Sequence, residues 1–496
     1  MRFTIKEILQ ATTGELLVAP EDEERLFDGI VWDSREVTPG CVYLALPGQR
    51  VDGHDFVAAA LESRAGCALV ARDMPEDVVA VAEAAGAALV KVADTSQAIV
   101  DLARAWRPRL SGLVVGITGS SGKTTTKNLV RDVLASTRTV VATKANQNNE
   151  LGVPRTVLNA AADTEAVVVE MGMRGLHQID NLCTYVQPQW GLITNVGESH
   201  IELLGSRANI ARAKAELFGA LPDKTGVAFV NAADDYAEAV VSTAQLDARG
   251  VTVVAYDGSL DAEDHCRKLR AGARVRPAVW AQDISLDGEG RPTFTLCAAG
   301  FDAFGFAQDA PVSCTLALQG LHNVSNAVSA AAVGHAAGMS LEACAQALEE
   351  ARPESGRQEI LTAPNGVNVI NDSYNANPDS MHAALTTLSA LDVAGKRVAV
   401  LGDMGELGSF AEDLHRRVGT LCASVNLDLL VCVGDLARFI AEAAVDAGFD
   451  PEAVTCTDTN QQALAYLAPR LKAGDTVLVK ASHFMRFDEI VKGLIA

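Results

Sequence analysis

The 496-residue chain has little positive charge for its size. It carries 41 lysine and arginine residues against 63 aspartate and glutamate residues, which gives a formal net charge of −22 at pH 7. This excess of negative charge opposes non-specific binding to nucleic acid and to anionic membrane surfaces. We therefore expect no nucleic-acid partner, and an anionic ligand would need basic groups gathered locally.

The sequence also lacks long apolar runs and paired cysteines. No uninterrupted apolar stretch is long enough to span a bilayer, and Met1–Glu7 lacks the apolar core of a signal peptide. The ten cysteines are scattered without metal-type spacing, which is typical of reduced thiols in the cytosol. We expect a cytoplasmic protein with no membrane insertion. Five cysteines are typical of single buried thiols: Cys183, Cys266, Cys297, Cys314 and Cys344.

The chain is too long for one ordinary domain. Apolar, β-branched segments alternate with helical patterns in three successive units, which predicts an α/β fold with domains at 1–110, 111–352 and 353–496. The middle unit is expected to hold a parallel sheet with a small antiparallel appendage, because the short strands at 279–281, 293–297 and 314–318 follow one another without helices. An insert-like stretch at 261–273 has no assigned role.

A glycine-rich loop stands near the start of the middle unit. Gly116–Thr125 reads GITGSSGKTT, follows the apolar segment Leu113–Val115 and precedes apolar residues at helical spacing. Backbone N–H groups and the helix dipole favour an anion at such a turn, Lys123 can reach outer phosphates, and the Thr124 hydroxyl suits Mg²⁺. Ile117 departs from a strict Walker A spacing. The loop predicts an ATP-dependent enzyme whose nucleotide contacts include Gly119, Ser120, Ser121, Gly122, Lys123, Thr124 and Thr125.

Polar residues follow two predicted strands of the middle unit. Glu170 ends the apolar strand 166–169, where α/β proteins bind ligands, and it is placed to hold Mg²⁺ directly or through water. His200 follows the next strand; a lone histidine is more often structural, but its position beside the predicted metal site favours a ligand. Lys214 lies on a helical segment, where the residues alone favour a lysine whose stem covers apolar surface.

Two polar turns flank a strand in the first unit. These are Asp33–Arg35 and Asp52–His54, on either side of Val42–Leu46. Their composition fits a binding loop and ordinary turn chemistry equally well.

Taken in order, these motifs resemble those of the Mur ligase family of peptidoglycan synthesis, over nearly the whole chain. Tyr374–Pro378 and Gly402–Gly408 resemble the members that add D-alanyl-D-alanine, and the Asp-Asn-Pro-Arg signature of relatives that add a diamino acid is absent. The most specific marks are the loop at 116–125, Asn148-Asn149 with Gly152 and Pro154, Glu170–Gly172, Thr194–Val196 with His200, and Gly320 with His322, Asn323 and Asn326.

The resemblance implies three domains and a two-step reaction. An N-terminal domain would hold the UDP-sugar, a central ATPase would bind ATP and Mg²⁺, and a C-terminal Rossmann-like domain would close over the site. The terminal carboxylate of UDP-N-acetylmuramoyl-tripeptide would attack the γ-phosphate of ATP. The amine of D-alanyl-D-alanine would then attack the resulting acyl phosphate and expel phosphate.

The resemblance also implies roles for particular residues. The catalytic residues would be Lys123, Asn149, His200 and Lys214. The metal ligands would be Thr124, Glu170, His200 and, if it is carbamylated, Lys214. Near the adenine, the ribose and the phosphates we expect His322, Asn323, Asn326, Arg357 and Asp372. Substrate contacts are expected from Asp33, Ser34, Arg35, Asp52 and His54 on the uridine nucleotide, and from Tyr374, Asn375 and Asn377 near the dipeptide.

Three other functions remain open at this point. A sister ligase would add a single amino acid, and a folylpolyglutamate synthase shares the core chemistry but is disfavoured by the domain that precedes the phosphate loop. A regulatory P-loop NTPase would hydrolyse ATP without an amine acceptor. In each case the partners are small molecules, and we expect a monomer.

Overall fold

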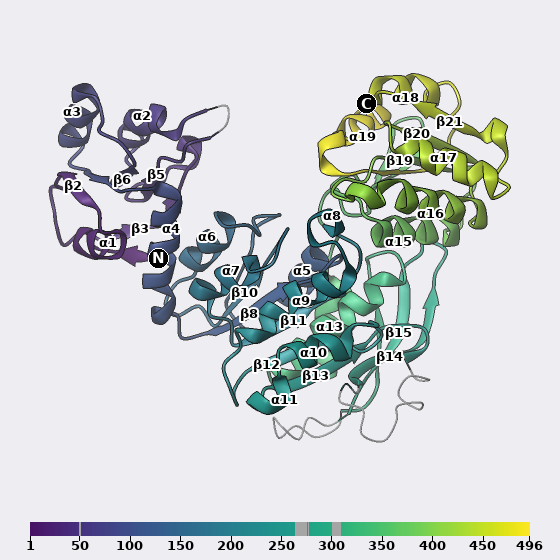
Figure 1. Ribbon diagram of the computed structural model, residues 1–496, viewed down its shortest axis with the longest axis horizontal. Helices are drawn as coiled ribbons and strands as arrows, with labels where there is room; N and C mark the ends of the chain where they lie inside the picture. The colour runs from purple at the N-terminus through teal and green to yellow at the C-terminus, as the bar shows by residue number, and fades with distance from the viewer. Residues whose placement is uncertain (49–50, 263–274, 276, 300–308) are drawn as a thin grey trace.

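The protein consists of three α/β domains (Figure 1), as the sequence predicts. The computed structural model describes residues 1–48, 51–262, 275, 277–299 and 309–496. The middle domain forms the base of the molecule, and the N- and C-terminal domains rise from it on opposite sides (Figure 1). Cys266 and residues 263–273 of the insert-like stretch lie outside the described residues.

The N-terminal domain is built on a five-stranded sheet with the order β2-β7-β6-β5-β4. All neighbours in this sheet run parallel except β2 and β7. A capping box at Thr4 starts the first helix, because Thr4 and Glu7 satisfy each other's backbone N–H groups. The bounds are α1 Ile5–Thr12, β2 Glu15–Val18, β4 Ile30–Val31, β5 Val42–Leu44, α2 Val57–Glu62, β6 Cys67–Val70, α3 Glu76–Ala84, β7 Ala88–Lys91 and α4 Thr95–Trp106, and a two-stranded sheet pairs β1 Arg2–Phe3 with β3 Phe27–Asp28.

The middle domain has one nine-stranded sheet with the order β16-β15-β14-β13-β12-β11-β8-β10-β9. The predicted antiparallel appendage is confirmed, and it extends the main sheet because β14 pairs with β13 in parallel before β15 and β16 turn antiparallel. The strand bounds are β8 Leu113–Thr118, β9 Val140–Ala142, β10 Ala166–Glu170, β11 Trp190–Ile193, β12 Val227–Asn231, β13 Thr252–Asp257, β14 Pro277–Leu286, β15 Pro292–Ala298 and β16 Val312–Thr315.

Helices cover both faces of the middle sheet. Val115 and Val168 point to one face and Val114 and Val167 to the other, so the central strands are apolar on both sides, as parallel strands between helices must be. One face packs against α5 Lys123–Ala135, α13 His322–Ala336 and α14 Leu341–Glu350, and the other against α6 Gly152–Asn159, α7 Gln178–Val186, α9 Arg207–Gly219 and α10 Ala237–Thr243.

The C-terminal domain is a six-stranded, doubly wound sheet with the order β17-β18-β22-β19-β20-β21. Only the edge strand β17 runs antiparallel to its neighbour. Among the described residues, no helix of the protein combines the length and the apolarity needed to cross a bilayer. The bounds are β17 Glu359–Thr362, β18 Asn368–Asn371, α15 Pro378–Ala390, β19 Arg397–Gly402, α16 Ala411–Ser424, β20 Leu429–Val433, α17 Ala437–Asp446, β21 Val454–Thr457, α18 Asn460–Leu467, β22 Thr476–Lys480 and α19 Asp488–Ile495.

Directional hydrogen bonds join the N-terminal domain to the middle domain. The buried guanidinium of Arg107 donates to the carbonyl oxygens of Val186 at 2.7 Å and Gln187 at 2.9 Å. The indole Nε1 of Trp106 donates to the carbonyl of Ala160 at 2.8 Å. The segment Arg107–Arg109, between the two domains, is therefore a structured joint.

We predict that Arg107→Ala destabilises the protein. The substitution leaves the carbonyl oxygens of Val186, Gln187 and Leu110 without their guanidinium donor, so the free energy of unfolding should fall by about 2 kcal/mol. Urea denaturation followed by circular dichroism measures the change. Arg104→Ala is the matched control, because Arg104 forms an exposed ion pair with Asp101 that is expected to contribute less than about 0.5 kcal/mol. Equal losses in the two variants would contradict the prediction.

Candidate functional site

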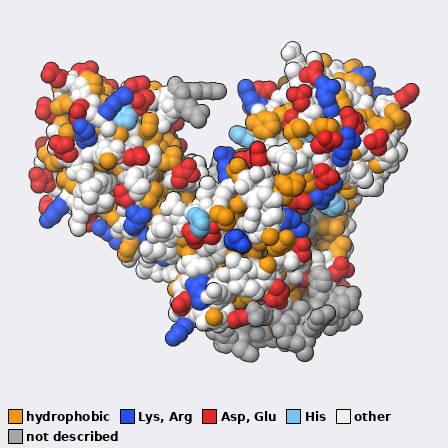
Figure 2. Space-filling model, viewed as in Figure 1, with side chains coloured by type: hydrophobic (Ala, Val, Ile, Leu, Met, Phe, Trp, Pro, Cys, Tyr) orange, Lys and Arg blue, Asp and Glu red, His pale blue; other side chains and the backbone are white. Residues whose placement is uncertain are grey.

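A cavity of about 1190 Å³ lies between the middle and C-terminal domains. Figure 2 shows the molecule hollowed between its N- and C-terminal arms, with the middle domain as the floor. No described residue of the N-terminal domain lines the cavity. Most of the predicted site residues do line it: Ser120, Ser121, Gly122, Lys123, Thr124, Thr125, Asn149, Glu170, His200, His322, Asn323, Asn326, Arg357, Asp372, Tyr374, Asn375 and Asn377.

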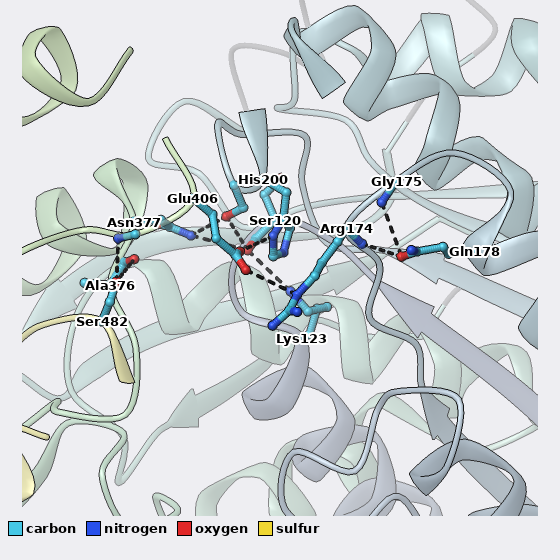
Figure 3. A network of polar contacts seen from close by, with 12 residues as sticks. Ser120, Lys123, Arg174, Gly175, Gln178, His200, Ala376, Asn377, Glu406 and Ser482 are labelled. Carbon is cyan, nitrogen blue, oxygen red and sulfur yellow. Dashed lines mark hydrogen bonds and ion pairs between the residues drawn. The ribbon is translucent and has the colours of Figure 1, made fainter. Parts of the chain in front are cut away.

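The glycine-rich loop is held against the end of β11. A side chain at Gly119 would place its Cβ 1.7 Å from the Thr194 hydroxyl, so only glycine fits there. The Asn195 side-chain oxygen accepts from the backbone N–H groups of Ser120 at 3.0 Å and Ser121 at 2.9 Å. Lys123 folds back over the loop, and its Nζ donates to the Gly119 carbonyl at 2.8 Å (Figure 3). A phosphate arriving at the loop would compete with that carbonyl for the ammonium group.

Glu170 carries a carboxylate oxygen that has no partner. The side chain is 1% exposed, and its Oε1 accepts from the Thr124 hydroxyl at 3.2 Å and from Asn148 Nδ2 at 2.8 Å. Its Oε2 is buried without a hydrogen bond. Buried polar atoms are nearly always satisfied, and a carboxylate beside a hydroxyl is a donor set that suits a hard divalent cation. Thr124 and Glu170 therefore fit Mg²⁺.

Lys214 is buried on α9 and does not reach the surface. It is only 1% exposed, which rules out the interpretation of a lysine with its ammonium in water. Burial holds the pKa of Lys214 well below its usual range; the charge of Lys123 adds to this shift and Asp234 opposes it. A neutral amine is therefore favoured near the phosphate loop.

Asn149 and the asparagines of α13 line the cavity and also form hydrogen bonds within the protein. The Asn149 side-chain oxygen accepts from the backbone N–H of Gly152, the first residue of α6, at 3.0 Å. Asn326 Nδ2 donates to Asn323 Oδ1 at 2.9 Å, and Asn326 Oδ1 accepts from Thr126 on α5 at 3.1 Å. These bonds tie α13 to the helix that follows the phosphate loop.

His322 is neutral at pH 7. Burial lowers the pKa of His322 to about 4; Asp372 opposes this shift and Lys480 adds to it. Lys480 Nζ itself forms a buried ion pair with Asp372 Oδ2 at 2.7 Å. The neutral imidazole lines the cavity, and its contact with an adenine stays a prediction.

Polar side chains of the C-terminal domain contact the middle domain across the cavity. Arg357 Nη2 donates to the Thr124 hydroxyl at 3.2 Å, and its guanidinium stacks 3.8 Å from the centre of the Tyr374 ring. Asn377 Nδ2 donates to the Ser199 hydroxyl at 2.5 Å and to the Ser120 carbonyl at 3.4 Å (Figure 3). These contacts bring both sides of the cavity to the phosphate loop.

The predicted residues of the N-terminal domain lie apart from the cavity. The Asp33 carboxylate binds Arg35, at 2.6 Å from its Nη2, and this hydrogen bond lowers the pKa of Asp33 to about 2. Ser34 lies in the same turn. Although it binds Asp33, the Arg35 side chain is 86% exposed. His54 is buried and uses both ring nitrogens within the domain: Nδ1 contacts Asp52 Oδ1 at 2.7 Å, and Nε2 accepts from the Ala71 N–H at 2.9 Å.

Several residues of the cavity escaped the sequence-based list of site residues. Asn195 and Asn148 belong to motifs that the sequence analysis names, Thr194–Val196 just after the strand β11 and Asn148-Asn149 in the loop before α6, so a signal for both was available. Arg174 and Glu406 form an ion pair across the domains, with Nε–Oε1 at 3.2 Å. No local sequence pattern predicts this ion pair, because Arg174 and Glu406 belong to different domains.

Comparison with known families gives three matches that together span most of the chain. Residues 27–107 match the model of the Mur ligase family, catalytic domain. Residues 117–334 match the Mur ligase middle domain, and residues 356–483 match the Mur ligase, glutamate ligase domain.

Curated relatives and solved structures resemble the chain over its full length. The UDP-N-acetylmuramoyl-tripeptide–D-alanyl-D-alanine ligase of Mycobacterium tuberculosis is 36% identical, covering 100% of this chain and 98% of the relative. The enzyme of the same name from Bacillus subtilis is 33% identical, covering 100% and 99%. The crystal structure of MurF from Acinetobacter baumannii has a TM-score of 0.81 at 29% identity and covers 100% and 99% of the two chains. The MurF ligase of Thermotoga maritima in complex with ADP has a TM-score of 0.73 at 25% identity and covers 94% and 97%.

We predict that Glu170→Gln weakens Mg²⁺-dependent nucleotide binding. The amide keeps the size of the side chain but removes its negative charge, so affinity for a non-hydrolysable ATP analogue at 1 mM Mg²⁺ should fall by about 10- to 100-fold. Titration calorimetry measures the affinity with Mg²⁺ and with EDTA. Glu165→Gln, just before the same strand, is the control because its exposed carboxylate binds Thr139. Wild-type affinity of Glu170→Gln in Mg²⁺ would contradict the proposed metal position.

Proposed function

The chain belongs to the Mur ligase family, and from this premise we propose that it joins D-alanyl-D-alanine to UDP-N-acetylmuramoyl-tripeptide at the expense of ATP. Full-length relatives named for this reaction support the proposal. The observation that carries it is that the phosphate loop, the unpartnered oxygen of Glu170 and the polar loops of the C-terminal domain face one cavity.

The first step brings two anions together. The terminal carboxylate of the tripeptide attacks the γ-phosphate of ATP, forming an acyl phosphate and releasing ADP. Lys123 and Arg357 lie at the loop and at Thr124, where they stabilise the charge of the phosphates. Mg²⁺ held by Thr124 and Glu170 supplies further neutralisation of that charge when it is bound. Asn149 is positioned at the same cavity to steady the transferred group.

The second step needs an amine beside the activated carbonyl. The amine of D-alanyl-D-alanine attacks the acyl carbon, the tetrahedral intermediate collapses, and phosphate leaves. We assign the dipeptide to the part of the cavity lined by Tyr374, Asn375 and Asn377. Asn377 donates to the phosphate loop itself, so the same residue links the acceptor side to the site of activation.

The remaining assignments follow the domain plan. We assign domains to 1–110, 111–352 and 353–496, with the uridine nucleotide on Asp33–Arg35 and Asp52. His54 acts there by holding Asp52, because both of its ring nitrogens are engaged within the domain. The adenine and ribose are assigned to His322, Asn323, Asn326 and Asp372. The protein works as a cytoplasmic monomer.

A product-resolved assay tests the reaction. Purified protein is incubated with ATP, Mg²⁺ and UDP-N-acetylmuramoyl-tripeptide, with and without D-alanyl-D-alanine, while phosphate release is followed and products are weighed by mass spectrometry. Dipeptide-dependent release with a UDP-N-acetylmuramoyl-pentapeptide product is expected. Release that ignores both substrates would leave only an NTPase, and release that depends on a single amino acid or on glutamate would indicate a sister ligase or a polyglutamate synthase.

We also propose that Lys214 works as a carbamate. A neutral, buried amine is the form that adds to CO₂: its nitrogen forms a bond to the carbon, and one proton leaves to solvent. The product is an anion in place of a neutral amine, so it attracts the charge of Lys123 and offers oxygen ligands for a divalent cation.

The carbamate has a direct spectroscopic test. Protein equilibrated with ¹³C-bicarbonate should show a carbamate carbon resonance that is missing in Lys214→Met, and this variant should lose about 100-fold or more in kcat. Lys6→Met, an exposed substitution on α1, should keep both the resonance and the rate. A wild-type spectrum without the resonance, under conditions in which the enzyme turns over, would overturn the assignment.

A further inference from the structure

Glu406 reaches from the C-terminal domain to a predicted metal ligand of the middle domain. It lies in the loop after β19, and its Oε2 forms an ion pair with His200 Nδ1 (Figure 3). Its other carboxylate oxygen pairs with Arg174 Nε at 3.2 Å. Its backbone carbonyl accepts from the Glu202 N–H at 3.3 Å. One residue of the C-terminal domain therefore contacts three residues around the cavity floor.

The backbone of this loop has a left-handed conformation at Glu406 and at Gly408. Glu406 has a φ of +61°, a left-handed conformation that residues with a side chain adopt rarely. Gly408 follows with a φ of +52°, and a Cβ on it would lie 2.6 Å from Glu202 Cγ. Strained backbone of this kind persists where surrounding contacts hold it, and here those contacts come from the other domain.

The same contact places a carboxylate beside one ring nitrogen of His200. The imidazole lines the cavity, its side chain is 22% exposed, and the residue has a φ of +63° just before the helix α8 Ile201–Leu204. The Glu406 carboxylate lies against Nδ1, which leaves Nε2 as the ring nitrogen that can bind a cation. Histidines that bind metals usually have a carboxylate or carbonyl beside their other ring nitrogen.

We propose that Glu406 is a positioning residue that orients His200 for a divalent cation, so that this cation site is complete only when the C-terminal domain is docked. The proposal rests on the assignment of His200 as a metal ligand under the proposed function. Arg174 balances the carboxylate from the middle domain, and the ion pair between Arg417 and Glu198, at 2.7 Å, holds the same side of the interface.

Coupling of this kind works in both directions. If docking of the C-terminal domain strengthens cation binding at His200, then the cation must favour the docked arrangement by the same factor. Cation binding would therefore help to bring Arg357 and Asn377 to the phosphate loop, although neither residue forms a hydrogen bond or ion pair with His200 within the part of the chain that the structure describes.

The test measures Mn²⁺ binding to the full chain in the presence of β,γ-methylene-ATP, by electron paramagnetic resonance. Glu406→Gln should weaken the His200-dependent Mn²⁺ site by about tenfold. In a His200→Ala background, Glu406→Gln should have no further effect, because Glu406 acts through His200. Glu412→Gln is the control: it lies on the same domain and pairs with Arg416 on the surface. Wild-type Mn²⁺ affinity in Glu406→Gln, or an equal loss with and without His200, would overturn the proposal.

A second readout follows the domains themselves. Small-angle scattering should show a smaller radius of gyration when Mn²⁺ and the analogue are added to the wild type, and a reduced change for Glu406→Gln. If Glu406→Gln folds poorly, Glu406→Asp takes its place in both measurements. Its shorter carboxylate cannot reach His200, so the same losses are expected. Both measurements need no peptide-bond formation. A protein that shows this coupling but makes no pentapeptide would refute the proposed function alone, and a ligase without the coupling would refute the role of Glu406 alone.

Discussion

The close approach of the glycine-rich turn to the end of β11 governs the rest of the site. Gly119 lies where any side chain would strike Thr194, and the Asn195 amide holds two successive N–H groups of the turn. With the turn fixed in this way, α5 begins at Lys123, and Thr124 meets Glu170 from the neighbouring strand β10. The proposed phosphate and metal positions therefore depend on one piece of backbone, held between adjacent parallel strands.

Two lysines of this acidic protein line the cavity. Despite the net charge of −22, Lys123 and Lys480 both lie there, and burial lowers the pKa of each. Burying a cation without full compensation is unfavourable. Asp372 compensates the charge of Lys480, whereas Lys123 contacts only backbone carbonyls of the loop, so an anionic nucleotide would supply the compensating charge for Lys123. The acidic surface at the same time repels larger polyanions.

The two joints between the domains differ in kind. The N-terminal joint uses buried donors, Arg107 and Trp106, on backbone carbonyls of the middle domain. The C-terminal joint instead runs through charged and polar side chains around the cavity, such as Arg357, Asn377 and Glu406. Polar, partly exposed contacts exchange readily with water and ligands, whereas buried ones do not. Domain motion during the reaction is therefore expected at the C-terminal joint.

The sequence by itself determined the three α/β units, the glycine-rich loop between a strand and a helix, and the place of Glu170 at the end of a strand. These features depend on the alternation of apolar segments, the spacing of glycines and the polar residues at strand ends, which are all local patterns. It also sufficed for the family. Only the tertiary structure decided that Lys214 is buried, that both nitrogens of His54 are engaged within its domain, and that Glu406 meets His200. Burial and contacts between domains depend on residues far apart in the chain, and short-range patterns carry no information about how those residues meet.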